Sequence, residues 1–296
     1  MKPAKFTYHE PISLKVAFDL LTEHGDEATL IAGGQSLIPV MNLRLAQPKH
    51  LIDINSIDEL SGIDEGTECI TLGALTRHGV IECSAMLKLR CPILPAAAHR
   101  IGHLAIRSRG TIGGSLVNAD PAAEWSLMAI LLDAEMTVQS AHGVRIIRAR
   151  NFIQSVYTSD VEDHEILTAV SFPVLKDDEG WSIQQVCRRA GDFAIVSVAV
   201  TMLLNEKDDI EDLRLSVGGM DVTPMRLVEF ERKAIGQVPD QAWISAIAKA
   251  SAQLGNPESD IHASATYRRE VCEVLIEQAL AEALQRARGL GDSTNG

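Results

Sequence analysis

Two glycine pairs organise this chain: Leu30-Ile31-Ala32-Gly33-Gly34-Gln35-Ser36-Leu37 and Gly110-Thr111-Ile112-Gly113-Gly114-Ser115-Leu116. Each pair lies between an apolar run and a run with helical spacing. Paired glycines allow a positive φ and let a ligand approach the bare main chain, and the serine after each pair adds a hydroxyl. This combination suits a diphosphate. Either pair alone fits a tight turn equally well, but two copies favour a ligand held between them.

Length and composition predict a globular protein of two or three domains. The chain has 296 residues, of which 46% are hydrophobic, enough for a sizeable core. No apolar stretch approaches the roughly 20 residues of a membrane span. The first residues, MKPAKFTYHE, lack the apolar core of a signal peptide, so we expect a cytoplasmic protein. A net charge of −13 without a strong basic cluster argues against nucleic-acid binding.

Cysteines and histidines give no sign of a metal centre, and we expect none in this chain. None of the five cysteines forms C-x-x-C, and no group of them has zinc or iron–sulfur spacing: Cys69, Cys83, Cys91, Cys187 and Cys272. His99 and His103 are four residues apart and could share a helix face. No third ligand accompanies them, so a surface or core role is the simpler interpretation.

Hydrophobic patterns predict an α+β fold made of α/β lobes. Strand patterns occur at 28–32, 50–54, 69–74, 136–139, 144–147, 166–172, 181–186, 194–204 and 213–217. The run 194–204 is continuous enough to be a central strand. Helical patterns occur at 13–21, ended by Gly25, and at 36–45, 95–101, 240–254 and 267–287. The polar run 176–180 suggests a domain boundary near residue 176.

A further helix is predicted to start at Asp120, with Asp120 as N-cap and Pro121 in the first turn. The apolar run 127–132 would bury that helix. Glu124 is one residue late for a capping box. It is either a solvated acid favoured by the helix dipole or a hydrogen-bond acceptor for a ligand along the second glycine pair.

Three motifs together resemble the FAD-binding medium subunit of molybdenum hydroxylases, the group of carbon monoxide dehydrogenase and xanthine dehydrogenase. They are AGGQSLIPVMNLRL (32–45), TIGGSLVNADPAAE (111–124) and RRAGDFA (188–194). The resemblance spans nearly the whole chain in order. It implies a PCMH, or vanillyl-alcohol-oxidase-type, FAD fold with lobes at 1–57 and 58–175. A C-terminal α/β domain of the CO-dehydrogenase flavoprotein type would occupy 176–288. Independently of the resemblance, the sequence of residues 289–296 predicts a disordered tail.

The same resemblance assigns the FAD contacts. It places the pyrophosphate on Ile31, Ala32, Gly33, Gly34, Gln35, Ser36, Leu37, Thr111, Ile112, Gly113, Gly114 and Ser115. It packs Ile101 and Leu167 on the cofactor, lets Glu124 contact it, and puts Asp192 and Phe193 at the isoalloxazine ring. Gln184 stands where some relatives place a lysine near the flavin, and Phe193 stands where many carry tyrosine.

The function implied by the resemblance is electron relay. FAD, bound noncovalently, would take electrons from two [2Fe–2S] clusters of a small subunit and pass them to a terminal acceptor. Substrate hydroxylation would belong to a molybdopterin-binding large subunit, in a dimer of heterotrimers. A stand-alone FAD oxidoreductase of the same fold and a non-catalytic protein with a degenerate flavin site are the alternatives. The substrate and the electron acceptor are not determined by this chain.

Overall fold

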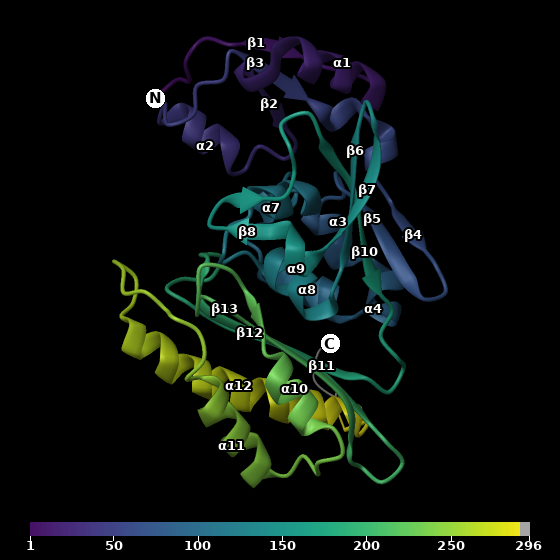
Figure 1. The fold of residues 1–296 in the computed structure, drawn as a ribbon, viewed down its shortest axis with the longest axis vertical. Coiled ribbons are helices and arrows are strands. Elements are labelled where there is room, and N and C mark those ends of the chain that lie inside the picture. Colours follow the sequence, from purple (N-terminus) through teal and green to yellow (C-terminus); the bar gives the residue numbers. More distant parts are fainter. Residues whose placement is uncertain (291–296) are drawn as a thin grey trace.

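Three main β-sheets follow one another down the molecule in sequence order, each with its own helices (Figure 1). The computed structural model describes residues 1–290. Most of the predicted disordered tail, residues 291–296, therefore lies outside the described residues. No helix within 1–290 is long and apolar enough to cross a bilayer.

A parallel three-stranded sheet with the order β1-β3-β2 forms the N-terminal unit. Its elements are β1 (Thr7–His9), α1 (Leu14–His24), β2 (Ala28–Ile31), α2 (Leu37–Asn42) and β3 (His50–Asp53), with short 3-10 turns at Gly25–Glu27, Ile54–Ser56 and Asp58–Leu60. Helix α1 begins where the Ser13 hydroxyl accepts from the Val16 N–H. It buries Ala17, Phe18 and Leu21 in the core of this unit.

The middle unit is built on an antiparallel five-stranded sheet with the order β4-β5-β10-β6-β7. The strands are β4 (Ile63–Glu65), β5 (Cys69–Gly73), β6 (Glu135–Ser140), β7 (Gly143–Arg148) and β10 (Ile166–Pro173). The helices are α3 (His78–Cys83), α4 (Ala85–Arg90), α5 (Ile93–Arg100), α6 (Leu104–Arg107), α7 (Ile112–Asn118), α8 (Glu124–Leu132) and α9 (Ala149–Phe152), and β8 (Ile153–Ser155) pairs with β9 (Thr158–Ser159). Helix α8 is apolar on nearly every side and is buried for that reason.

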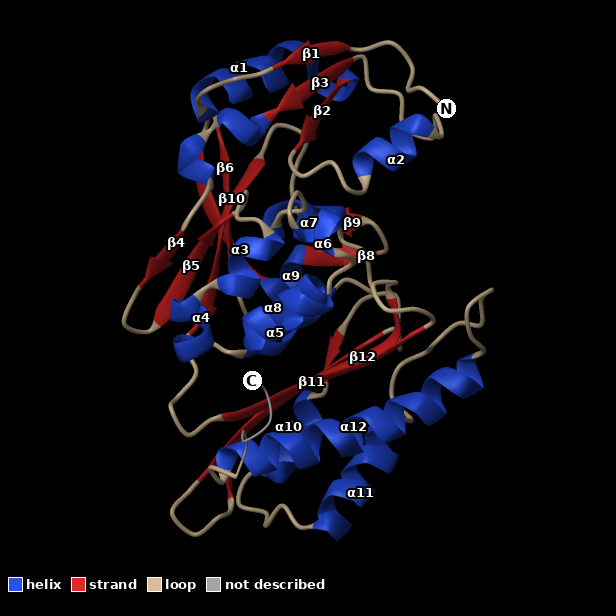
Figure 2. Cartoon of the chain, turned by 180° about the vertical axis from the view of Figure 1, so that it is seen from behind, coloured by secondary structure: helices blue, strands red, loops and turns tan. Residues whose placement is uncertain are grey.

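The C-terminal unit is an antiparallel four-stranded sheet sandwiched between helices. Its elements are β11 (Gly180–Cys187), β12 (Ala194–Leu204), β13 (Ile210–Gly218), β14 (Met225–Arg226), α10 (Val228–Ala234), α11 (Gln241–Ser251) and α12 (Ala265–Ala287). Strand β12 lies between β11 and β13 and is buried along almost its whole length, which confirms the predicted central strand. Figure 2 shows α12 and α11 on one side of this sheet and α5 and α8 of the middle unit on the other.

Two predicted helical features are wrong. The second glycine pair does not precede a helix, as its place between an apolar run and a helical run suggests, because Gly113 and Gly114 lie in the first turn of α7, with Thr111 as its N-cap. The helix expected to start at Asp120 begins instead at Glu124. The Asp120 carboxylate accepts from the Ala122 N–H at 2.9 Å and from the Tyr157 hydroxyl at 3.1 Å, and so closes a local turn rather than capping a helix.

The suggested pair of histidines on one helix face is also corrected. Helix α5 contains His99 but ends at Arg100, whereas His103 precedes α6. The His99 ring instead contacts Glu82, with its Nδ1 2.7 Å from the Glu82 Oε1.

Candidate functional site

The two glycine pairs touch each other across the junction of the N-terminal and middle units. A Cβ built on Gly33 would lie only 2.4 Å from the Arg109 carbonyl oxygen and 2.7 Å from the Gly110 Cα. A Cβ on Gly114 would lie 3.6 Å from the Ala32 Cβ. Gly34 takes a φ of +70°, which favours glycine there. The two pairs therefore lie at one junction, and the expectation that they hold one ligand between them stays a prediction.

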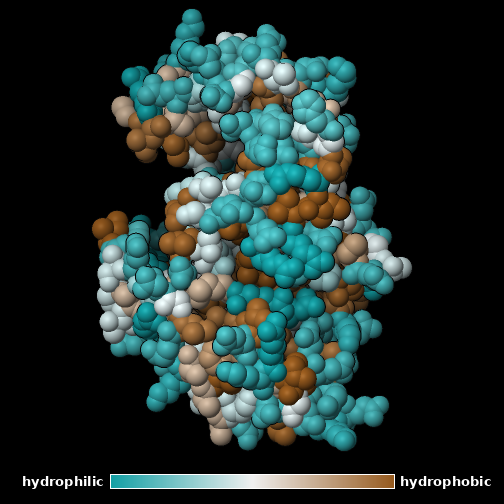
Figure 3. Space-filling view, in the orientation of Figure 1, coloured by the Kyte–Doolittle hydropathy of each residue, from teal (hydrophilic) through white to brown (hydrophobic). Residues whose placement is uncertain are grey.

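A cavity of about 480 Å³ opens at this junction, within the usual range for a small-molecule site. Of the residues assigned to FAD from the sequence, it is lined by Ile31, Ala32, Gly33, Gly34, Gln35, Ser36, Leu37, Ile101, Thr111, Gly113, Gly114, Ser115, Glu124, Leu167 and Phe193. In the space-filling view the surface is hollowed beside α2, with apolar side chains at the border (Figure 3).

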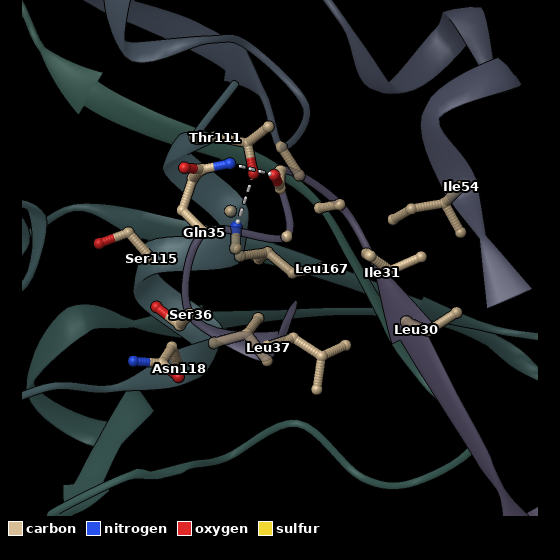
Figure 4. A pocket seen from close by; sticks show the side chains of 18 of the residues that line it. Leu30, Ile31, Gln35, Ser36, Leu37, Ile54, Thr111, Ser115, Asn118 and Leu167 are labelled. Atoms are coloured by element: carbon tan, nitrogen blue, oxygen red, sulfur yellow. Dashed lines mark hydrogen bonds between the residues drawn. The ribbon is translucent and has the colours of Figure 1, made fainter. Parts of the chain in front are cut away.

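Polar and apolar walls are separated within the cavity. Figure 4 shows the polar ends of Ser36, Ser115 and Asn118 turned the same way, away from Leu30 and Ile31. The Gln35 amide is held by donation to the Gly33 carbonyl at 2.9 Å. One wall can thus hold a polar group while the other packs against an apolar one.

The main-chain donors of the two pairs differ in availability. In the second pair, the N–H of Ile112 donates to Thr76, that of Gly113 to Ala74, and that of Gly114 to the Thr111 hydroxyl. In the first pair, the N–H groups of residues 33–36 make no hydrogen bond within the described part of the chain. Free main-chain donors therefore come from the first pair, whereas the second contributes a rigid wall and the Ser115 hydroxyl.

Two residues that the sequence did not single out lock the units together. Arg77 donates to the Arg109 carbonyl at 2.5 Å and to the Asn55 Oδ1 at 2.5 Å. Asn55 in turn donates to the Ala32 carbonyl at 2.8 Å. This chain of hydrogen bonds links the peptide before Gly33 to the peptide before Gly110. No sequence motif indicated it, because the partners lie far apart along the chain.

A buried histidine forms the floor beneath Gly110. Indole Nε1–H is only a donor, and Trp125 Nε1 lies 3.0 Å from His78 Nδ1, so this imidazole nitrogen accepts. Burial, together with the neighbouring Arg77 and Arg107, lowers the pKa of His78 to about 4. The ring is therefore neutral at pH 7, with its proton on Nε2, and adds no charge to the cavity that it lines.

Glu124 lines the cavity and is nearly inaccessible to solvent, with 4% of its surface exposed. Burial, with a smaller contribution from nearby Asp120, raises the pKa of its carboxyl to about 7. A solvated first-turn acid does not fit this environment, and the alternative of a hydrogen-bond acceptor for a ligand stays a prediction. Phe193, 58% exposed, lies on the same cavity.

Three assigned residues do not line this cavity. Ile112 is fully buried in the core of the middle unit. Gln184 donates to the Glu282 carboxylate at 2.6 Å. Asp192 lines a neighbouring cavity of about 830 Å³, which shares Phe193 and Asp120 with the first.

Comparison with known proteins agrees with this architecture. Residues 4–175 match the FAD binding domain in molybdopterin dehydrogenase, and residues 181–283 match the CO dehydrogenase flavoprotein C-terminal domain. The chain is 39% identical to the 6-hydroxypseudooxynicotine dehydrogenase complex subunit alpha of Paenarthrobacter nicotinovorans, over 99% of both chains. It is 38% identical to the glyceraldehyde dehydrogenase medium chain of Sulfolobus acidocaldarius, over 95% of this chain and 99% of that one.

A solved structure gives the same result. Carbon monoxide dehydrogenase from Hydrogenophaga pseudoflava that lacks the Mo-pyranopterin moiety has a chain with a TM-score of 0.93 and 32% identity, covering 97% of this chain and 99% of that one. The predicted fold class, the oxidoreductase assignment and FAD as cofactor are thereby confirmed. This chain belongs to the family of FAD-binding medium subunits of molybdenum hydroxylase complexes.

Proposed function

We propose that this chain relays electrons within a molybdenum hydroxylase complex, from [2Fe–2S] clusters of a small subunit to a terminal acceptor. Bound FAD supplies the chemistry, because a flavin accepts electrons singly and releases them in pairs. The molybdopterin-binding large subunit completes the complex, as a dimer of heterotrimers. A cytoplasmic location stays a prediction.

The contact between the two glycine pairs over the cavity supports this function most directly. The free N–H groups of residues 33–36, with the hydroxyls of Ser36 and Ser115, suit the oxygens of a diphosphate. The apolar wall made by Leu30, Ile31 and other residues suits flat, apolar ring surface. These residues fit FAD, and we assign the pyrophosphate to the first pair and its surroundings.

The ring end of FAD is assigned to Glu124 and Phe193, both of which line the cavity. With a pKa of about 7, the Glu124 carboxyl can donate or accept a hydrogen bond at neutral pH. Phe193 offers an aromatic face without a hydroxyl. We keep Gln184 outside the contact set, since its amide is engaged by Glu282.

Cysteine placement agrees with clusters held by another subunit. Cys91 and Cys272 are buried, Cys69 and Cys83 are exposed, and Cys187 is intermediate. Among residues 1–290, no group of three or more candidate metal ligands includes a cysteine.

The relay is tested by anaerobic reduction with dithionite, comparing the assembled complex with the isolated FAD-loaded chain. The measured quantity is the rate at which the visible flavin band bleaches. Clusters that feed the flavin should make bleaching in the complex faster than in the isolated chain at the same dithionite concentration. Equal rates, or clusters that stay reduced beside an oxidised flavin, would contradict the proposal.

A further inference from the structure

Three histidines meet in the N-terminal unit, away from the cavity. His9 ends β1, His24 ends α1 and His50 begins β3, at the purple end of the molecule in Figure 1. When one ring nitrogen is taken from each histidine, the three nitrogens all lie within 4.8 Å of one another. In sequence they are isolated and show no ligand spacing, so only the fold reveals them.

Strand pairing and the end of α1 create this cluster. Strands β1 and β3 run parallel, with Thr7 opposite His50 and His9 opposite Ile52. This register sets His9 Nε2 2.9 Å from His50 Nδ1. The helix stops at Gly25, so that the His24 ring stacks on the His50 ring with centroids 3.7 Å apart.

The three rings are left short of partners. His9 and His50 share one hydrogen bond, and the His24 ring makes no side-chain hydrogen bond within residues 1–290. All three are half-buried. Neutral imidazole is the form of histidine that binds metals.

We propose that His9, His24 and His50 bind one divalent transition-metal ion of the zinc class. Imidazole is a preferred ligand for such ions, and three histidines with water in the fourth position form a known zinc geometry. Zinc–nitrogen bonds of about 2.0–2.1 Å put neighbouring nitrogens roughly 3.3 Å apart. Ring nitrogens of different histidines would therefore have to approach one another by about 1.5 Å at most. The stacking of the His24 ring on the His50 ring would be lost.

None of its three histidines lines the cavity, so the site lies apart from the residues assigned to FAD. A bound ion would join a three-residue strand, the end of α1 and the central strand β3 of one sheet. Strand β2 pairs with β3 and runs directly into the first glycine pair. The ion would thus stiffen the unit that positions Gly33 and Gly34, independently of any electron relay.

The test is calorimetric titration of the untagged, FAD-loaded full chain with Zn²⁺ after chelator treatment. We expect one ion per chain, an affinity at least tenfold lower in His24→Gln and in His9→Gln, and no change in His142→Gln. His142 is a matched control, since it lies beside another histidine, His164, outside the cluster. Zn²⁺ should also raise the Tm of the wild type and of His142→Gln, but not of His24→Gln.

Flavin content measured on each variant shows whether it is folded. The proposal is overturned if the wild type binds no Zn²⁺, or if His24→Gln and His9→Gln bind it as tightly as the wild type. Equal losses in His24→Gln and His142→Gln would indicate diffuse surface binding and would overturn it as well. Co²⁺ as a spectroscopic probe should give tetrahedral absorption bands only when the cluster is intact.

Discussion

Replacing Gly33 with alanine tests whether FAD binding depends on direct main-chain contact between the two glycine pairs. The new Cβ would lie 2.4 Å from the Arg109 carbonyl oxygen, whereas ordinary contact begins near 3.4 Å. One segment must therefore move by about 1 Å. The next nearest atom, Gly110 Cα at 2.7 Å, belongs to the same peptide and is also main chain, so no side-chain rotation relieves the clash.

Overpacking of this kind costs about 1–3 kcal/mol. The FAD-free chain can relieve the strain if its N-terminal and middle units separate slightly. A cofactor that contacts both units requires them to be closed, so the strain lowers the affinity of the chain for FAD. The dissociation constant of FAD in Gly33→Ala should then rise by about 5- to 150-fold.

The assay is fluorescence titration of the FAD-free chain with FAD, together with the Tm of each form. Gly79→Ala is the matched control, because a Cβ there would lie 3.4 Å from the Arg107 carbonyl, an acceptable contact, and alanine is favoured in a helix such as α3. FAD should bind the control with wild-type affinity. Wild-type affinity and Tm in Gly33→Ala would refute the reasoning.

Three further substitutions probe the same site. In Gly114→Val the new Cβ would lie 2.8 Å from the Thr111 hydroxyl and 3.6 Å from the Ala32 Cβ, so a folded chain, judged by circular dichroism, should purify without FAD. Arg77→Met removes the hydrogen bonds to Asn55 and Arg109 and should lower the free energy of unfolding by about 1–3 kcal/mol, measured in urea. Glu124 holds a proton in the folded chain that the unfolded chain releases between pH 4.5 and 7, so the stability of the FAD-free wild type should fall by about 3 kcal/mol as pH rises through that window. Urea unfolding of Glu124→Gln across the same pH range should lack this component.

The periodic elements were predictable because local signals and tertiary packing agree. Ser13 and the apolar spacing after it predict α1, and the unbroken apolar run of β12 predicts its central position. The prediction of a helix start at Asp120-Pro121 was wrong because an aspartate can close a turn as readily as it can cap a helix. The available partners, Ala122 and Tyr157, decide between the two. Tyr157 comes from a distant segment, so the sequence near Asp120 could not reveal the outcome.

The residues of the candidate site also fall into two groups, those that a local motif predicts and those that it does not. Its glycines and serines carry a local motif and were assigned from it. Arg77, Asn55 and His78 act through partners from distant segments, and no local pattern predicts such pairs. The histidine cluster is the extreme case, because three isolated residues become neighbours only after β1 pairs with β3.

The charge of the cavity explains why backbone geometry matters so much here. The described residues that line it include Asp120, Glu124, Glu162, Asp163 and Glu165, but no lysine or arginine. A chain of net charge −13 must therefore hold a diphosphate without a facing cation. Main-chain N–H groups and hydroxyls can do this only when they converge within hydrogen-bond distance. We expect the close contact at Gly33 and the Arg77–Asn55 link to hold these donors in place, so small displacements of the backbone should weaken FAD binding more than changes of surface charge.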